Sequence, residues 1–67
     1  MAIVDRYLTE REAAQFLGLE PSTLKAWRWR GEGPSYAKFG RAVRYSQSTL
    51  FKYAERSVKS PGSQHAA

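Results

Sequence analysis

Apolar residues recur at helical spacing in three stretches of the chain, and turn-forming residues separate these stretches. The apolar residues of the first stretch are Ala13, Ala14, Phe16 and Leu17. Thr9 stands before them and Glu12 follows it by three positions, which is the pattern of a capping box. Gly18 suits the left-handed position that ends a helix. The pattern therefore predicts a helix over residues 10–17.

A second helix is predicted from Pro21 to about Arg30. Proline fits the first turn of a helix, because the N–H that it lacks would have no intrahelical partner there. Glu20 takes the cap position, where its charge favours the helix N-terminus but its side chain caps less well than Ser or Asp. Gly31 ends the helix. Two short helices joined by residues 18–20 are typical of a helix-turn-helix.

A β-hairpin is predicted after the second helix. Residues 36–39 and 42–45 flank Gly40-Arg41, and glycine at the first of two turn residues is what a type II′ turn requires. A lone hairpin is not stable in water, so we expect this one to pack against the helices.

The last helix is predicted to begin after Ser46, which caps it, and to run to about Val58. Its apolar positions are Leu50, Phe51, Tyr53 and Ala54. Residues 60–67 contain no large apolar side chain and are expected to form a flexible tail. We therefore predict one domain over residues 1–59. Its fold class is mainly α with a β-hairpin, in the order of a winged helix-turn-helix: helix-turn-helix, two-stranded wing and third helix.

Positive charge is concentrated in the second part of the chain. The formal net charge is +5. Residues 1–20 carry two basic and four acidic side chains, whereas residues 21–60 carry nine basic and two acidic ones. Such asymmetry is typical of a protein that binds a polyanion, although a solvated basic surface gives the same composition. The chain has no cysteine and no apolar run long enough for a membrane span, so we expect a soluble, cytoplasmic protein.

The second helix has one face for the core and one for a ligand. Helical projection places Leu24 and Trp27 inward, where we expect a core shared with Ala13, Leu17 and Leu50. Ser22, Lys25, Ala26 and Trp29 point outward, with Thr23 and Arg30 on one flank and Arg28 on the other. Small residues permit close approach to a major groove, and Lys25 and Arg28 can reach guanine or phosphate. Ser22 and Thr23 suit a phosphate at the helix N-terminus, or simple capping.

Two further features of this surface concern the hairpin and Trp29. Arg41 at the turn suits the minor groove, with Lys38 and Arg44 along the strands, unless these cations only solubilise the turn. For the exposed indole of Trp29 we favour packing against protein over a base contact. The predicted DNA-binding residues are Ser22, Thr23, Lys25, Ala26, Arg28, Arg30, Lys38, Arg41 and Arg44.

No set of residues suited to catalysis is found, and we expect no enzyme, metal or cofactor. There is a single histidine, His65, to which we assign no role. The Gly31-Glu32-Gly33 segment lacks the third glycine and the preceding strand of a phosphate-binding loop.

Residues 7–57 resemble the excisionase-type helix-turn-helix family, which is related to MerR-like winged helices. The matching segments are Leu8-Thr9, Glu12-Ala13-Ala14, Leu17-Gly18, Pro21-Ser22-Thr23-Leu24, Trp27, Arg30-Gly31-Glu32-Gly33-Pro34, Gly40-Arg41-Ala42-Val43-Arg44-Tyr45 and Ser48-Thr49-Leu50. The resemblance implies base contacts by Ser22, Thr23, Lys25 and Arg28, and a wing role for Arg41. Glu20 departs from the Ser that the family usually has at the cap.

The resemblance also implies a biological role. It indicates an excisionase, or recombination directionality factor, that binds repeated sites in double-stranded DNA cooperatively, bends them and turns an integrase toward excision. Its partners would be further protomers assembled head-to-tail on DNA and a site-specific integrase, in the bacterial cytoplasm at the nucleoid. The alternatives are a small transcriptional regulator of phage, plasmid or genomic-island genes, and a protein- or RNA-binding adaptor.

Overall fold

The computed structural model describes residues 5–61 of the 67-residue chain. The elements are β1 (Tyr7–Leu8), α1 (Glu10–Leu17), α2 (Pro21–Trp29), β2 (Ala37–Phe39), β3 (Ala42–Ser46) and α3 (Gln47–Ser57). Most of the predicted tail, including His65, lies outside the described residues.

The predicted bounds of α1 are confirmed, together with both of its caps. The Thr9 hydroxyl accepts from the Glu12 N–H at 3.1 Å, and the Glu12 carboxylate accepts from the Thr9 N–H at 2.9 Å. The second of these bonds holds the pKa of Glu12 below its ordinary value. Gly18 ends the helix with φ of 72°, a conformation that side chains with a Cβ rarely adopt. Local capping chemistry is therefore enough to delimit this helix.

The other two helices also lie within a residue of their predicted ends. α2 begins at Pro21, and the cap residue Glu20 makes no side-chain hydrogen bond, in line with its weak capping chemistry. α3 begins after Ser46, whose hydroxyl accepts from the Thr49 N–H at 3.2 Å. Asp5 adds a second contact at this end, because it accepts from both the N–H and the hydroxyl of Ser48.

The predicted hairpin is present, and it belongs to a larger sheet than expected. Phe39 pairs with Ala42 across the Gly40-Arg41 turn. Gly40 has φ of 64°, and no non-glycine residue between 5 and 61 has positive φ, as a type II′ turn requires. The sheet has three antiparallel strands in the order β1-β3-β2. The sequence did not predict β1, because a two-residue strand carries no alternation of its own.

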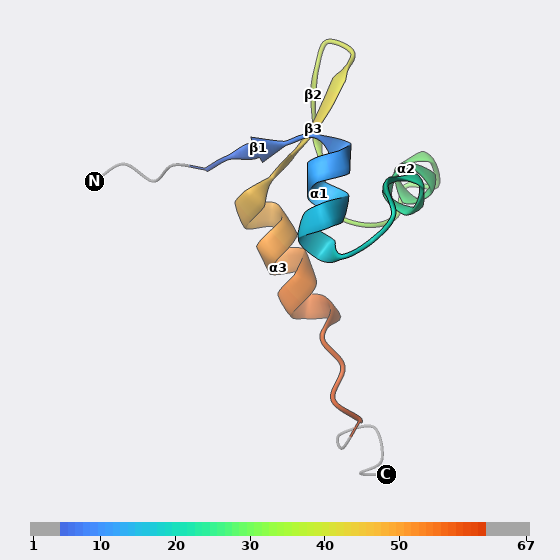
Figure 1. Cartoon of the computed structure of the whole chain (residues 1–67), viewed down its shortest axis with the longest axis vertical. Helices are drawn as coiled ribbons and strands as arrows, with labels where there is room; N and C mark the ends of the chain where they lie inside the picture. The colour runs from blue at the N-terminus through green and yellow to red at the C-terminus, as the bar shows by residue number, and fades with distance from the viewer. Residues whose placement is uncertain (1–4, 62–67) are drawn as a thin grey trace, which may run out of the picture.

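The core lies where α1 packs against β3, α2 and α3 (Figure 1). Its buried residues are Leu8, Ala13, Ala14, Leu24, Tyr45 and Leu50, with Leu17, Leu19, Trp27 and Val43 packed against them. Two apolar side chains differ from expectation: Phe16 and Phe51, expected among the apolar positions of the first and third helices, are 42% and 57% exposed. Tyr45, for which the sequence pattern predicted no core position, is buried at 1% exposure.

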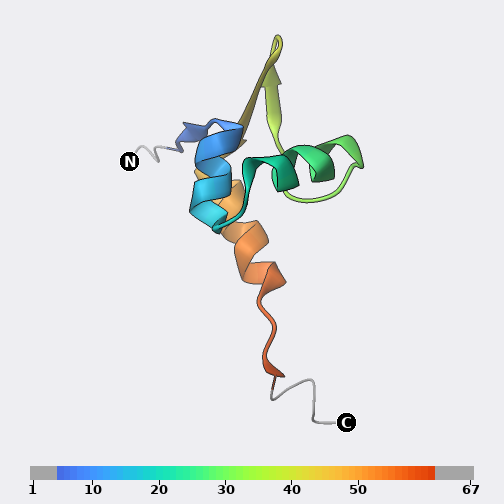
Figure 2. The same cartoon turned by 45° about the vertical axis from the view of Figure 1, so that its right-hand side comes forward.

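The hairpin of β2 and β3 projects away from the three helices (Figure 2). The arrangement confirms a winged helix-turn-helix, with α1 and α2 as the helix pair and the hairpin as the wing. Within residues 5–61 no helix is both long and apolar enough to cross a membrane.

Candidate nucleic-acid interface

The outer face of α2 is open to solvent. Ser22, Lys25 and Ala26 are exposed, whereas Leu24 on the opposite face is buried at 1% exposure. In Figure 1 α2 is seen almost end-on, with one side turned away from α1 and α3. The predicted division of this helix into a core face and an outer face is therefore confirmed. Thr23 lies between the two faces and is partly buried.

The inner face of α2 is fixed by Trp27, which lies against the loop that follows the helix. A Cβ added to Gly33 would come within 2.9 Å of the Trp27 ring, and Gly33 has φ of 82°. The Glu32 N–H donates to the Trp27 carbonyl at 2.7 Å. The loop can lie so close to the indole only because residue 33 has no side chain. These contacts set the direction in which the outer face points.

The sequence pattern predicted that Arg28 extends outward from the flank of α2. In the structure it turns inward instead. Its guanidinium donates to the Glu10 carboxylate of α1 through Nε at 3.0 Å and Nη2 at 3.3 Å. The two side chains are 19% and 21% exposed. The bond to Glu10 raises the pKa of Arg28 above its ordinary value. The helical projection placed Arg28 correctly at the edge of the outer face, but it could not show that a carboxylate of α1 draws the guanidinium inward.

Two tyrosines complete the surroundings of this ion pair. The Tyr45 hydroxyl of β3 donates to the same Glu10 carboxylate at 3.2 Å. Burial, followed by the nearby negative charge of Glu10, raises the pKa of Tyr45 to about 12. The Arg28 guanidinium lies 5.8 Å from the ring centroid of Tyr36, which itself packs against the Tyr45 ring. We call Glu10, Arg28, Tyr36 and Tyr45 the Glu10 network. It joins α1, α2 and β3, and sequence reasoning missed it.

The wing places its cations on different sides. Arg41 is exposed at the turn, as predicted. Lys38 pairs with Val43 and Arg44 pairs with Ala37, so Lys38 and Arg44 lie on opposite faces of the hairpin. Lys38 is exposed, whereas Arg44 is partly buried and donates from Nη1 to the Val43 carbonyl at 2.8 Å. The register therefore places the two strand cations on opposite sides of the wing.

Arg30, the last predicted DNA-binding residue, lies beyond the end of α2. Its Nη2 contacts the Glu32 carboxylate at 3.3 Å, and the two side chains are 56% and 59% exposed. An ion pair this exposed contributes little to stability, so it does not prevent Arg30 from moving to a phosphate.

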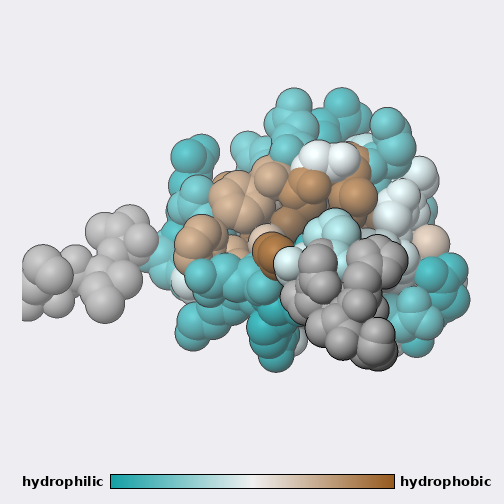
Figure 3. Space-filling model, turned by 90° about the horizontal axis from the view of Figure 1, so that it is seen from below, coloured by the Kyte–Doolittle hydropathy of each residue, from teal (hydrophilic) through white to brown (hydrophobic). Residues whose placement is uncertain are grey.

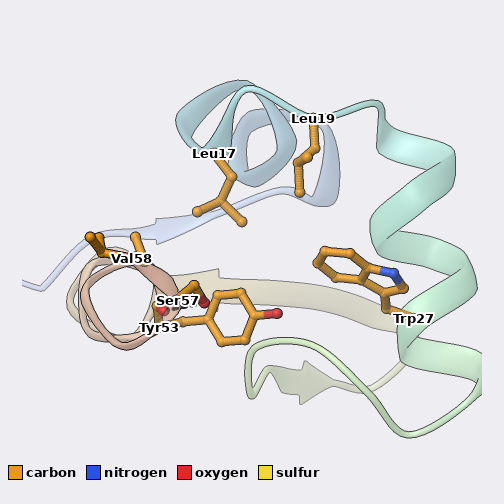
Figure 4. Close-up of a pocket in the computed structure, with 7 residues that line it drawn as sticks. Leu17, Leu19, Trp27, Tyr53, Ser57 and Val58 are labelled. Carbon is orange, nitrogen blue, oxygen red and sulfur yellow. Dashed lines mark hydrogen bonds between the residues drawn. The ribbon is translucent and has the colours of Figure 1, made fainter. Parts of the chain in front are cut away.

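An apolar cleft lies on the core side of α2, away from its outer face. Its volume is about 310 Å³. Figure 3 shows apolar surface gathered on this side of the molecule, and Figure 4 shows Trp27 of α2 and Tyr53 of α3 facing each other across the cleft. The lining residues are Leu17, Leu19, Trp27, Tyr53, Ala54, Ser57 and Val58. Among residues 5–61 there is no group of His, Asp or Glu side chains that could hold a metal ion.

Comparison with known proteins agrees with this arrangement. The family profile described as "Helix-turn-helix domain" matches residues 7–58, a range that includes every helix and strand described above. No curated protein and no solved structure showed significant similarity to the chain. The matched family is a DNA-binding family that includes excisionase-like proteins. The chain therefore belongs to the helix-turn-helix domain family and is a DNA-binding protein.

Proposed function

We propose that this protein is an excisionase-type DNA-binding protein. It binds short repeated sites in double-stranded DNA cooperatively, bends the DNA and directs a site-specific integrase toward excision. The observation that carries the proposal is the exposed outer face of α2, which presents small residues and a cation. Beside it projects a wing with Arg41 at its turn. The family match supports it, because excisionase-like proteins belong to that family.

The outer face of α2 enters the major groove. The helix has nine residues, which gives a length of roughly 14 Å, and the groove of B-DNA is about 12 Å wide. Ser22 and Ala26 are exposed and small, so the helix backbone can approach the base edges closely. Lys25 is exposed on the same face and reaches guanine or a phosphate.

The N-terminus of α2 receives a phosphate. Glu20 does not cap the helix with its side chain, so no side chain at that position competes for the N–H groups of the first turn. The helix dipole favours an anion at this end. The hydroxyls of Ser22 and Thr23 add donors beside it.

Arg28 positions α2 and does not read bases in this proposal. Its guanidinium already donates twice to Glu10, and moving it to a guanine would leave a partly buried carboxylate with only the Tyr45 hydroxyl. The Glu10 network therefore keeps α2 at a fixed angle to α1 and to β3, the strand that continues into the wing. The two DNA contacts are then made by one rigid unit.

The wing enters the minor groove next to the site of α2. Arg41 inserts there, and narrow A·T tracts attract such a cation most strongly. Lys38 and Arg44 lie on opposite faces of the hairpin, so they contact the two phosphate backbones that border the groove.

Several protomers occupy adjacent repeats. One short helix and one wing read too few base pairs for high affinity, whereas protomers that contact each other gain affinity through their high effective concentration on DNA. Repeated sites in the same orientation place the protomers head-to-tail, so that two different surfaces of the protein meet at each contact. A contact of this kind does not close on itself, so further protomers can be added to the row. The integrase meets this row on the bent DNA.

The proposal is tested on DNA selected from a random duplex pool. The selected motif is placed in one, two or three copies, and binding is followed by electrophoretic shift, with circular permutation to detect a bend. We expect cooperative binding to two or three copies, a bend, and an affinity that falls with the logarithm of salt concentration. Non-cooperative binding to one copy without a bend would contradict the excisionase role and favour the transcriptional regulator. Absence of any shift at low salt and micromolar protein would contradict both.

A further inference from the structure

We infer that Trp29 is a direct DNA contact, and that its indole recognises the 5-methyl group of thymine in the major groove. The inference rests on the proposed function, because it adds a specificity-determining residue to the contact made by α2. It also replaces our expectation that Trp29 packs against protein.

The position of Trp29 on the helix is the first argument. Residues 22, 26 and 29 are spaced by four and three positions, which places their side chains on one face of α2. Trp29 is 76% exposed, and Ser22 and Ala26 are exposed beside it. The rise from residue 22 to residue 29 is about 10 Å, or roughly three base steps. The indole therefore lies within the stretch of groove that the helix occupies.

The second argument is that nothing in the described part of the chain covers this ring. Trp27, two residues earlier, packs on the core and meets the Tyr53 ring at 6.3 Å between centroids. Trp29 forms no aromatic or cation–π pair within residues 5–61. A tryptophan buries a large apolar area when it finds a partner, so the free indole retains that binding energy for a ligand.

The inward turn of Arg28 is the third argument. With the Arg28 guanidinium on Glu10, the remaining exposed cations of this side of α2 are Lys25 on the outer face and Arg30 at the end of the helix. A phosphate contact carries no sequence information, and a guanine contact by Lys25 reads a single base pair. An apolar side chain adds sequence discrimination at a further position, because thymine is the base that presents a methyl group in the major groove.

A second copy of the chain is the competing partner for Trp29. Such a copy would also cover Ala26 and Lys25, which share the face, and would keep α2 out of the groove. The charge on this face and at the wing favours a polyanion over a second copy with the same net charge of +5.

The decisive experiment removes the methyl group from DNA and the indole from the protein. Each thymine of the selected duplex is replaced in turn by deoxyuridine, which lacks only the methyl, and dissociation constants are measured for wild type, Trp29→Ala and Phe51→Ala. Phe51 is the matched control, since it is an exposed aromatic residue on α3. At one thymine we expect the replacement to weaken wild-type binding about fourfold, the ratio that corresponds to about 0.8 kcal/mol for one buried methyl. Trp29→Ala binds several-fold more weakly and is insensitive to that replacement, whereas Phe51→Ala behaves as wild type.

Fluorescence supplies an independent measurement. The chain has two tryptophans, so Trp27→Phe leaves Trp29 as the sole indole. We expect its emission to change on titration with the selected duplex, with the same midpoint as the electrophoretic shift.

Three results would overturn the inference. The first is insensitivity of the wild type to deoxyuridine at every thymine, and the second is wild-type sensitivity retained by Trp29→Ala. A self-association of the DNA-free protein that Trp29→Ala abolishes would assign the indole to a second copy. The proposed function stands in each case in which the wild type still binds the repeated sites cooperatively and bends them. It fails separately, when the wild type binds a single copy without cooperativity or a bend, or does not bind the selected duplex at all.

Discussion

The Arg28 guanidinium of α2 meets the Glu10 carboxylate of α1 through two nitrogen–oxygen contacts of 3.0 and 3.3 Å, although 18 positions separate the residues. A paired geometry of this kind fixes both the distance and the orientation of the two side chains. The orientation of the Tyr45 hydroxyl is fixed as well, because it donates to the same carboxylate. The relative placement of the two helices of the helix-turn-helix thus depends on a polar contact as well as on the core.

Arg28→Met is expected to lower the free energy of unfolding by about 1–3 kcal/mol, since it leaves the partly buried Glu10 carboxylate without its cation. Urea denaturation measures the change. Arg30→Met is the matched control, because its pair with Glu32 is exposed and its loss should cost less than about 0.5 kcal/mol. Equal effects of the two variants would show that the Glu10 contact does not stabilise the fold.

Alkaline titration is expected to show one tyrosine that ionises late. The folded pKa of Tyr45 is raised to about 12, from an ordinary value of about 10. A raised folded pKa means that the stabilising effect is complete below pH of about 10 and is lost as the pH rises toward about 12. The ultraviolet absorbance of phenolate, compared between wild type and Tyr45→Phe, isolates this group from the other tyrosines. A difference curve centred near the ordinary value would contradict the buried contact with Glu10.

Gly33→Ala is expected to be more destabilising than Gly31→Ala. Both glycines have positive φ, at 82° and 72°, and a Cβ in this conformation costs about 1 kcal/mol or more. Only at Gly33 would the new Cβ also meet the Trp27 ring, at 2.9 Å, since nothing lies within 4 Å at Gly31. The difference between their urea midpoints measures the Trp27 contact. Indistinguishable midpoints would mean that the loop moves away at no cost.

Arg41→Ala is expected to weaken DNA binding without changing the selected motif of α2. The arginine is exposed at the turn, so the fold should keep its stability. Loss of a phosphate or minor-groove cation should reduce the slope of affinity against salt concentration by about 1. Binding isotherms at several salt concentrations test this. An unchanged slope together with unchanged affinity would remove the wing from the interface.

Local chemistry made much of the fold predictable. The bounds of α1 follow from local contacts: Thr9 and Glu12 bond to each other across the first turn, and the Gly18 N–H donates to carbonyls of the last turn. The hairpin register follows from Gly40, whose φ of 64° selects the two-residue turn. Helical periodicity was also enough to separate the buried Leu24 from the exposed Ser22 and Ala26.

The candidate site was predictable only in part, because some of its side chains are placed by contacts with residues distant in sequence. The outer face of α2 and the position of Arg41 depend on local geometry, and the sequence alone determined both. The direction of the Arg28 side chain, the burial of Tyr45 and the strand β1 were decided by the tertiary structure. Each depends on a partner distant in sequence: Glu10 lies 18 positions from Arg28 and 35 from Tyr45, and Leu8 pairs with Tyr45. A long flexible side chain turns toward whichever opposite charge the packed elements bring near. The periodicity of one segment cannot predict that charge, because it belongs to a residue distant in sequence.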